Sequence, residues 1–118
     1  MARILSVSYD ESLLKTRHFM LEQCGYEVTS ALGFTDSMKH CTGKGAFDLF
    51  VLGHSIPLHD KQALVHAFRD TCRGAVVALH RPGEDLASVG ADFQADPSDP
   101  AGMLELVTRI IRARSTAA

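Results

Sequence analysis

Short apolar segments alternate along this chain with longer amphipathic ones, and the short segments predict five β-strands. The third and fourth are almost entirely apolar, which is typical of strands that helices bury on both faces of a parallel sheet. The second is more polar, so we expect it nearer an edge of the sheet. The predicted strands are Arg3–Val7, Tyr26–Ala31, Phe47–Leu52, Ala75–Leu79 and Gly90–Ala95.

The segments between the strands predict helices, both from their apolar spacing and from the capping residues at their ends. The first helix follows Asp10 and Ser12, ends at Gly25, and takes its apolar positions from Leu13, Leu14, Phe19, Met20 and Leu21. The others are predicted from Thr35 or Asp36 to about Cys41 (ended by a Gly43–Gly45 turn), from Lys61 to about Cys72, within Pro82–Ser88, and after the Asp96–Pro100 turn. The last helix carries an apolar stripe of Met103, Leu106, Val107, Ile110 and Ile111.

The alternation of strand and helix, repeated five times, predicts an α/β protein. Right-handed crossovers then give a doubly wound parallel sheet with helices on both faces. The length of 118 residues suits one domain, and we expect it to span residues 1–118 with an ordered core of about residues 3–114.

Composition excludes several function classes. The 12 Lys and Arg residues against 14 Asp and Glu give a formal net charge of −2, so there is no electrostatic basis for nucleic-acid binding. Apolar segments are too short to span a bilayer, and Met1–Leu5 lacks the features of a signal peptide, so we expect a cytoplasmic protein. The three cysteines, Cys24, Cys41 and Cys72, are far apart and odd in number, and we expect reduced thiols rather than a disulfide.

Several motifs, taken in order, resemble the receiver domain of response regulators, the CheY-like family. They are Gly25-Tyr26-Glu27-Val28 after the first helix, Asp48-Leu49-Phe50-Val51-Leu52 followed by Pro57, Gly90-Ala91-Asp92 before the last strand, and Pro97 after it. The resemblance covers essentially the whole chain. It implies a flavodoxin-like (βα)5 fold whose five parallel strands lie in the order 2-1-3-4-5.

The resemblance also implies where the family's chemistry would lie, and this chain departs from it at each position. Receivers hold Mg²⁺ on an acidic pair, phosphorylate an aspartate, and use a hydroxyl residue and a lysine that precedes a cis-proline. The corresponding positions here are the pair Ser8 and Tyr9, the acceptor position Gly53, the hydroxyl position His80, the lysine position Asp96, and Pro97. The resemblance therefore implies a degenerate receiver with no phosphoacceptor, no cofactor and no enzymatic activity.

The expected charges at these positions also differ from those of the family. Asp10 is the acidic residue that remains beside the missing pair, and Asp96 reverses the charge of the lysine. A carboxylate introduced at Gly53 would lie beside both of them with no lysine to balance it, which would lower stability at neutral pH. The resemblance further implies a cis peptide bond between Asp96 and Pro97.

We therefore predict a phosphorylation-independent receiver-like module, an atypical response regulator that acts in bacterial signal transduction through protein–protein contact. Its partner would be another signalling protein or a second copy of itself, with no direct role for nucleic acid or membrane. The family's usual interaction face would present Arg81, Phe93, Arg109 and Arg112, where Phe93 matches the aromatic switch position of receivers.

The alternative is a sensor of a different class, which binds a small ligand or a metal at the altered carboxyl ends of the strands. Removal of acidic side chains and the small residue Gly53 would open space there. The candidate metal ligands are Asp10, His54 and His80, since imidazole and carboxylate groups suit divalent transition metals.

Overall fold

A computed structural model describes residues 1–42 and 46–116, and it contains the predicted alternation of strands and helices. The elements in chain order are β1 (Arg3–Ser8), α1 (Glu11–Gln23), β2 (Glu27–Leu32), α2 (Phe34–Lys39), β3 (Leu49–Leu52), α3 (Leu58–His66), the π-helix η1 (Ala67–Thr71), β4 (Ala75–Leu79), α4 (Leu86–Val89), β5 (Phe93–Ala95) and α5 (Pro100–Thr116). The turn predicted at Gly43–Gly45 lies outside the described residues. No helix in the described part of the chain is long and apolar enough to cross a membrane.

The five strands form one parallel sheet in the order β2-β1-β3-β4-β5, as predicted. The register places Ile4 of β1 between Val28 of β2 and Leu49 of β3. Every residue of β3 and β4 is buried, whereas β2, the more polar strand, forms one edge. The prediction that the apolar strands are central is therefore confirmed.

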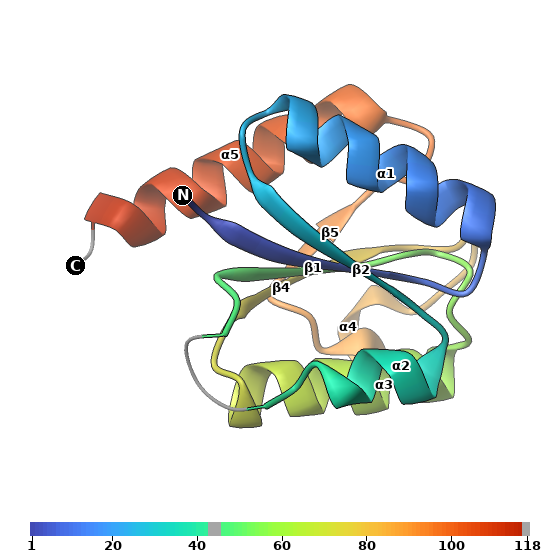
Figure 1. The fold of residues 1–118 in the computed structure, drawn as a ribbon. Helices are drawn as coiled ribbons and strands as arrows, with labels where there is room; N and C mark the ends of the chain where they lie inside the picture. Colours follow the sequence, from blue (N-terminus) through green and yellow to red (C-terminus); the bar gives the residue numbers. More distant parts are fainter. Residues whose placement is uncertain (43–45, 117–118) are drawn as a thin grey trace.

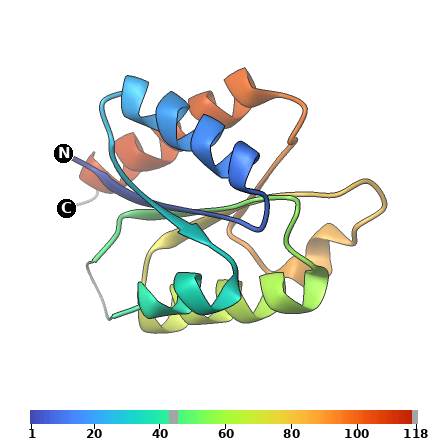
Figure 2. The same cartoon turned by 45° about the vertical axis from the view of Figure 1, so that its right-hand side comes forward.

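Two layers of helices cover the sheet, with α1 and α5 on one face and α2, α3 and α4 on the other (Figure 1). Each layer closes a separate apolar core. The core under α1 and α5 includes Ile4, Leu21, Val77 and Val107, and the core under α3 includes Leu5, Phe50, Leu64, Phe68 and Val76. A view turned by 45° shows the same two layers, with the N-terminus and the C-terminal part of α5 at one end of the sheet (Figure 2).

The buried face of α1 differs from the one predicted by its apolar residues. Leu14 and Leu21 are buried as expected, but Phe19 is 62% exposed. The third buried residue of this helix is Arg17, which retains only 6% exposure. Positions 14, 17 and 21 lie three and four residues apart, so the helix turns one arginine inward and one phenylalanine outward.

The helix predicted from Lys61 to about Cys72 begins earlier and ends differently. Pro57 is its N-cap residue, α3 starts at Leu58, and the last turn widens into the π-helix η1. The widened turn contains Phe68, whose ring stacks on Phe50 at 4.2 Å between centroids. The short helix predicted within Pro82–Ser88 is present as the single turn α4.

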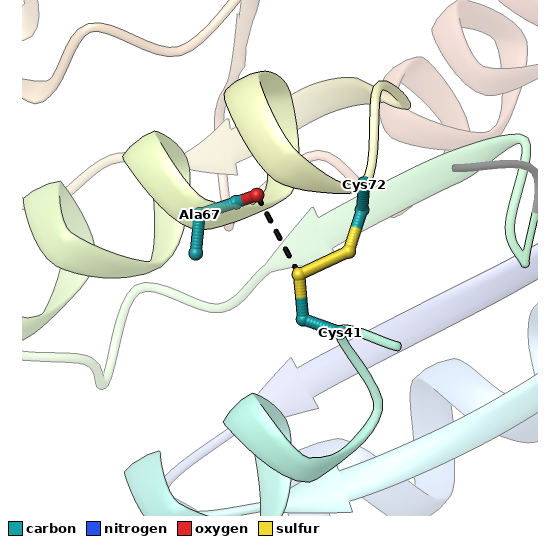
Figure 3. Close-up of a disulfide and its surroundings, with 3 residues drawn as sticks. All are labelled: Cys41, Ala67 and Cys72. Carbon is teal, nitrogen blue, oxygen red and sulfur yellow. Dashed lines mark hydrogen bonds between the residues drawn. A yellow bond between two sulfur atoms is a disulfide. The ribbon is translucent and has the colours of Figure 1, made fainter. Parts of the chain in front are cut away.

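The expectation of reduced thiols is wrong for two of the three cysteines. Cys41, just after α2, and Cys72, just after η1, form a disulfide with their Cα atoms 5.9 Å apart, while Cys24 is free (Figure 3). The Cys41 sulfur also lies 3.5 Å from the carbonyl oxygen of Ala67. The two cysteines are 31 positions apart in the sequence. Only the side-by-side packing of α2 and η1 on one face of the sheet, with their C-terminal ends together, brings them into contact.

We predict that reduction of this disulfide destabilises the protein. Because the cross-link closes a loop of 31 residues, chain-entropy arguments give a loss of about 3–4 kcal/mol in the free energy of unfolding. Urea denaturation with and without a phosphine reductant measures the loss, and Cys41→Ser should reproduce it. The Cys24→Ser variant is the matched control and should unfold like the unmodified protein. Equal midpoints for oxidised and reduced protein would contradict the prediction.

Candidate functional site

The residues predicted from the receiver resemblance gather at the carboxyl edge of the sheet. Ser8 ends β1, Gly53 follows β3, His80 follows β4 and Asp96 follows β5. Because all strands are parallel, their carboxyl ends meet at one edge, where doubly wound sheets bind ligands. We call this edge the rim and define it by Ser8, Tyr9, Asp10, Gly53, His54, His80 and Asp96.

The space beside Gly53 is filled by a side chain that sequence reasoning missed. A Cβ atom at position 53 would lie 2.7 Å from Nη1 of Arg17 and 3.2 Å from the carbonyl oxygen of Val7. Both distances are shorter than an ordinary contact, and the first requires Arg17 to move. The guanidinium of Arg17, on α1, therefore occupies the volume that a side chain at position 53 would enter.

Arg17 is held there by few polar contacts. Its Nη2 donates to Nδ1 of His54 at 3.2 Å, and its Nη1 is buried with no hydrogen-bond partner among the described residues. Burial lowers the pKa of the Arg17 guanidinium, and the charge of Asp10 opposes that shift. The sequence contained one signal for this residue, because position 17 shares a helix face with Leu14 and Leu21.

The acidic-pair positions are taken by neutral groups that join the loops of the rim. The Ser8 hydroxyl accepts the backbone N–H of Asp10 at 3.0 Å and lies 3.2 Å from the Ser55 hydroxyl, which accepts the N–H of Tyr9 at 3.1 Å. The Tyr9 hydroxyl donates to Asp60 at 2.8 Å. Burial, followed by this hydrogen bond and the Asp60 charge, raises the pKa of Tyr9 well above its usual value. These contacts tie β1 to the segment after β3 without a metal ion.

The two carboxylates of the rim accept hydrogen bonds from residues close to them in the sequence. Asp10 caps α1, where its Oδ1 accepts the N–H of Leu13 at 3.1 Å. Asp96 Oδ1 accepts both the hydroxyl and the backbone N–H of Ser98, at 2.7 and 2.8 Å. These two hydrogen bonds hold the pKa of the Asp96 carboxyl below its usual range, and nearby His80 lowers it further. Each carboxylate therefore acts first as a backbone cap.

The expected cis peptide before Pro97 is wrong. Among the described residues no peptide bond is cis, and the chain turns at this point through the contacts of Asp96 with Ser98. The family's lysine is absent here, and the turn that replaces it is a local one.

A buried lysine reaches the same edge from α3, another feature that sequence reasoning missed. Lys61 is fully buried, and its Nζ donates to Glu84 at 2.8 Å and to the carbonyl oxygen of Leu79 at 3.1 Å. The Glu84 side chain is 4% exposed. This ion pair attaches the segment after β4 to α3, so the lysine charge is already neutralised within the protein.

Arg81 completes the connection between the loops after β3 and β4. Its Nε donates to the carbonyl oxygen of His54 at 2.7 Å, and its Nη2 donates to that of Ser55 at 3.1 Å. Arg81, which the sequence predicted on an interaction face, therefore makes hydrogen bonds within the protein. Phe93 is 39% exposed, and Arg109 and Arg112 are exposed on α5.

His54 is poorly placed to hold a metal. Burial lowers the pKa of His54, and the charges of Arg17, Lys61 and Arg81 lower it further. Because a guanidinium only donates, Nδ1 of His54 accepts from Arg17 and its proton sits on Nε2, which leaves neither nitrogen free for a metal. Within the described part of the chain, no group of three or more His, Cys, Asp or Glu residues could hold a metal ion.

A small cavity adjoins the rim. A cavity of about 80 Å³ lies between α1 and the start of α5, and its lining includes Leu13, Arg17, Asp96 and Met103. Pockets for small organic ligands usually measure about 300–1,000 Å³. The wide pocket that the alternative hypothesis expected beside Gly53 is not open, because Arg17 fills it.

We predict that the Lys61–Glu84 pair is a major contributor to stability. Lys61→Met leaves the Glu84 carboxylate buried without a partner, and loss of one member of a buried pair should cost about 3 kcal/mol. Lys61→Met/Glu84→Gln should recover part of that loss. The control is Lys15→Met, which removes the exposed pair with Glu11 and should change stability by at most about 0.5 kcal/mol. Equal urea midpoints for the Lys61 and Lys15 variants would contradict this assignment.

His54 gives a second prediction, for pH. Its folded pKa lies below the unfolded value of about 6.5, so below that pH the unfolded chain takes up more protons. The contribution of His54 to the free energy of unfolding is therefore fully retained above pH ~6.5, and it is lost as the pH falls through the lowered pKa of the folded state. The His54→Gln variant should lose less stability between neutral and mildly acidic pH than the unmodified protein. Parallel stability–pH curves for the two proteins would argue against this role.

Comparison with known proteins supports the fold. No protein-family model matches the chain, and no curated protein matches its sequence. Among solved structures, the Vibrio cholerae chemotaxis protein CheY4 is 21% identical with a TM-score of 0.71, over 93% of this chain and 98% of that one. A two-component response regulator from Clostridium difficile is 19% identical with a TM-score of 0.80, over 95% and 97% of the two chains.

A third structure is similar over nearly its whole length. The N-terminal domain of a response regulator/sensory box/GGDEF three-domain protein from Carboxydothermus hydrogenoformans is 19% identical with a TM-score of 0.79, over 98% of both chains. At these identities the similarity establishes architecture and leaves the chemistry of the rim to be argued from its residues. The chain has the CheY-like receiver fold.

Proposed function

We propose that this protein is a phosphorylation-independent receiver-like module that acts in bacterial-type two-component signalling by contact with another protein. The observation that carries the proposal is the guanidinium of Arg17 in the space beside Gly53. A receiver needs a carboxylate nucleophile there, with room for a phosphoryl group and a metal ion. This chain has a glycine at that point, with a cation already packed against it.

The remaining contacts of the rim support the same reading. In a receiver, phosphorylation adds charge to which neighbouring groups respond. The charged groups of this rim are instead bound to other groups of the same protein. Lys61 is bound to Glu84, Arg81 binds two carbonyl oxygens, and Asp10 and Asp96 cap backbone amides. We infer that the loops after β3 and β4 stay in one arrangement, and that the module signals by being present or bound rather than by being modified.

The proposal includes the class of partner. The Thermotoga maritima response regulator TrrA, 20% identical to this chain with a TM-score of 0.73, was solved in complex with the histidine kinase ThkA. By analogy, the partner here would be another signalling protein or a second copy of this chain, in the cytoplasm, with no cofactor and no catalytic step. A ligand or metal sensor remains the second hypothesis in principle, but the filled space at Gly53 does not favour it.

We predict that acetyl phosphate with Mg²⁺ leaves the protein unmodified. The reason is that Gly53 offers no nucleophile and Ser8 and Tyr9 offer no metal-binding carboxylate. Intact-mass spectrometry should show no phosphoryl adduct, and amide NMR spectra should not change on addition of Mg²⁺. A receiver with an intact aspartate serves as the positive control. An adduct on this chain, or a Mg²⁺-dependent shift of the rim amides, would overturn the proposal.

The Gly53→Asp variant tests the role of Arg17 in the same assay. The sequence alone suggested that a new carboxylate would meet only Asp10 and Asp96, but the structure places Arg17 beside it, so we expect an internal ion pair and no phosphorylation. Loss of stability should come from crowding by Arg17 and Val7 rather than from like charges. Gly53→Asp/Arg17→Met removes the guanidinium and serves as the comparison. Ready phosphorylation of Gly53→Asp would show that Ser8, Tyr9 and Asp96 have been matched to the wrong family positions.

A further inference from the structure

A groove lies at the opposite edge of the sheet from the rim, beside the amino ends of β4 and β5. It has a volume of about 630 Å³, which is in the range of established ligand pockets. Its apolar lining includes Ala75, Phe93 and Ile110, of which Phe93 is 39% exposed. The C-terminal part of α5 forms one wall, at the end of the molecule where the N-terminus lies (Figure 1).

Three arginines line this groove, and one of them is already engaged. Arg69 pairs with Asp92 at 3.3 Å and donates to the carbonyl oxygen of Gly90 at 2.7 Å. Asp92 in turn accepts the backbone N–H of Val76 at 2.9 Å. The one carboxylate of the lining is therefore neutralised by a neighbour and a backbone amide.

The other two arginines, Arg73 and Arg114, are exposed and have no carboxylate within ion-pair distance among the described residues. The chain as a whole has a formal net charge of −2, so this positive charge is a local feature. Arg73 also has a φ of 57°, a left-handed conformation that side-chain-bearing residues adopt at a cost. A glycine would adopt this conformation freely, so backbone conformation alone does not favour an arginine at position 73.

We propose that this arginine groove binds an acidic segment of a partner protein, whose carboxylates pair with Arg73 and Arg114 while an apolar side chain packs on Phe93 and Ile110. The inference deepens the proposed function, because it rests on a protein partner and states its chemistry. Guanidinium groups bind carboxylates through paired, charge-assisted hydrogen bonds.

The charge distribution favours a peptide over a compact phosphate group. The wall provided by α5 comes from its C-terminal half, where the helix dipole presents negative partial charge. That end of a helix disfavours a concentrated dianion. Single carboxylates spaced along an extended segment can reach Arg73 and Arg114 separately, with an apolar side chain between them. The combination of separated cations and an apolar surface therefore fits an acidic, partly apolar peptide.

The test uses a fluorescein-labelled synthetic peptide of alternating glutamate and leucine, titrated against the intact protein by fluorescence anisotropy. We expect measurable binding that weakens with added salt, and amide NMR shifts at Ala75, Phe93 and Ile110. Arg73→Gly should weaken binding about tenfold, in line with loss of one charge-assisted contact, while its melting temperature stays equal or rises. Arg114→Gln should weaken binding by a similar factor.

Lys39→Gln is the control, since it removes a positive charge from an exposed position of α2 that does not line the groove. It should leave the affinity within twofold. No binding, equal binding of a lysine–leucine peptide, an equal loss with Lys39→Gln, or a nucleotide that shifts these amides in place of the peptide would each overturn the proposal. The assay involves no phosphoryl donor, so its failure leaves the result with acetyl phosphate, and with it the proposed function, unaffected.

Discussion

The steric relation between Arg17 and Gly53 is the constraint on which the rim of this protein depends. A guanidinium on the inner face of α1 can lie over the end of β3 only because the residue there has no Cβ. In return, the arginine occupies the space beside the glycine that follows β3. The two residues are 36 positions apart in the sequence and act as one packing unit. Either one alone would leave a void or a clash.

That arrangement decides the electrostatics of the neighbouring loops. Burial lowers the pKa of His54, the buried Arg17 lowers it further, and the hydrogen bond from Arg17 orients the ring with Nδ1 as the acceptor. Lys61 brings a second cation to the same edge, and its charge is balanced by Glu84 in an ion pair that also holds the segment after β4. A third cation, Arg81, binds the carbonyl oxygens of the segment after β3. This chain has the receiver fold, and these cations are bound to groups of the protein itself.

The two edges of the sheet therefore differ in character. At the carboxyl edge, side chains are paired with one another and little space is left. At the amino edge, a disulfide joins α2 to the end of η1, and the next residue along the chain is Arg73, in a left-handed conformation beside an open groove. Function in this fold usually concentrates at the carboxyl edge. In this chain a groove with two exposed arginines, Arg73 and Arg114, lies at the other one.

The sequence by itself determined the architecture. Apolar runs such as Phe50–Leu52 and Val76–Ala78 can only be central strands, because both faces must be covered, and the intervening helical segments fix the parallel connections. The glycine that follows β3, four residues before Pro57, was equally readable, and the proposal that Gly53 stands at an acceptor position rests on that spacing. These features are local, and local sequence patterns can be interpreted without knowledge of long-range contacts.

Only the tertiary structure decided what fills the rim and which cysteines meet. Arginine and lysine side chains are usually solvated. Position 17 shares a helix face with Leu14 and Leu21, but no local pattern identifies a partner that lies 20 or more positions away, as His54 does for Arg17 and Glu84 for Lys61. The pairing of Cys41 with Cys72 depends on how α2 and η1 converge, and the turn at Pro97 depends on a competition between local hydrogen bonds and the family's geometry. Such outcomes are set by the energy of burying and pairing charges in a particular packed environment, and that environment does not exist until the chain has folded.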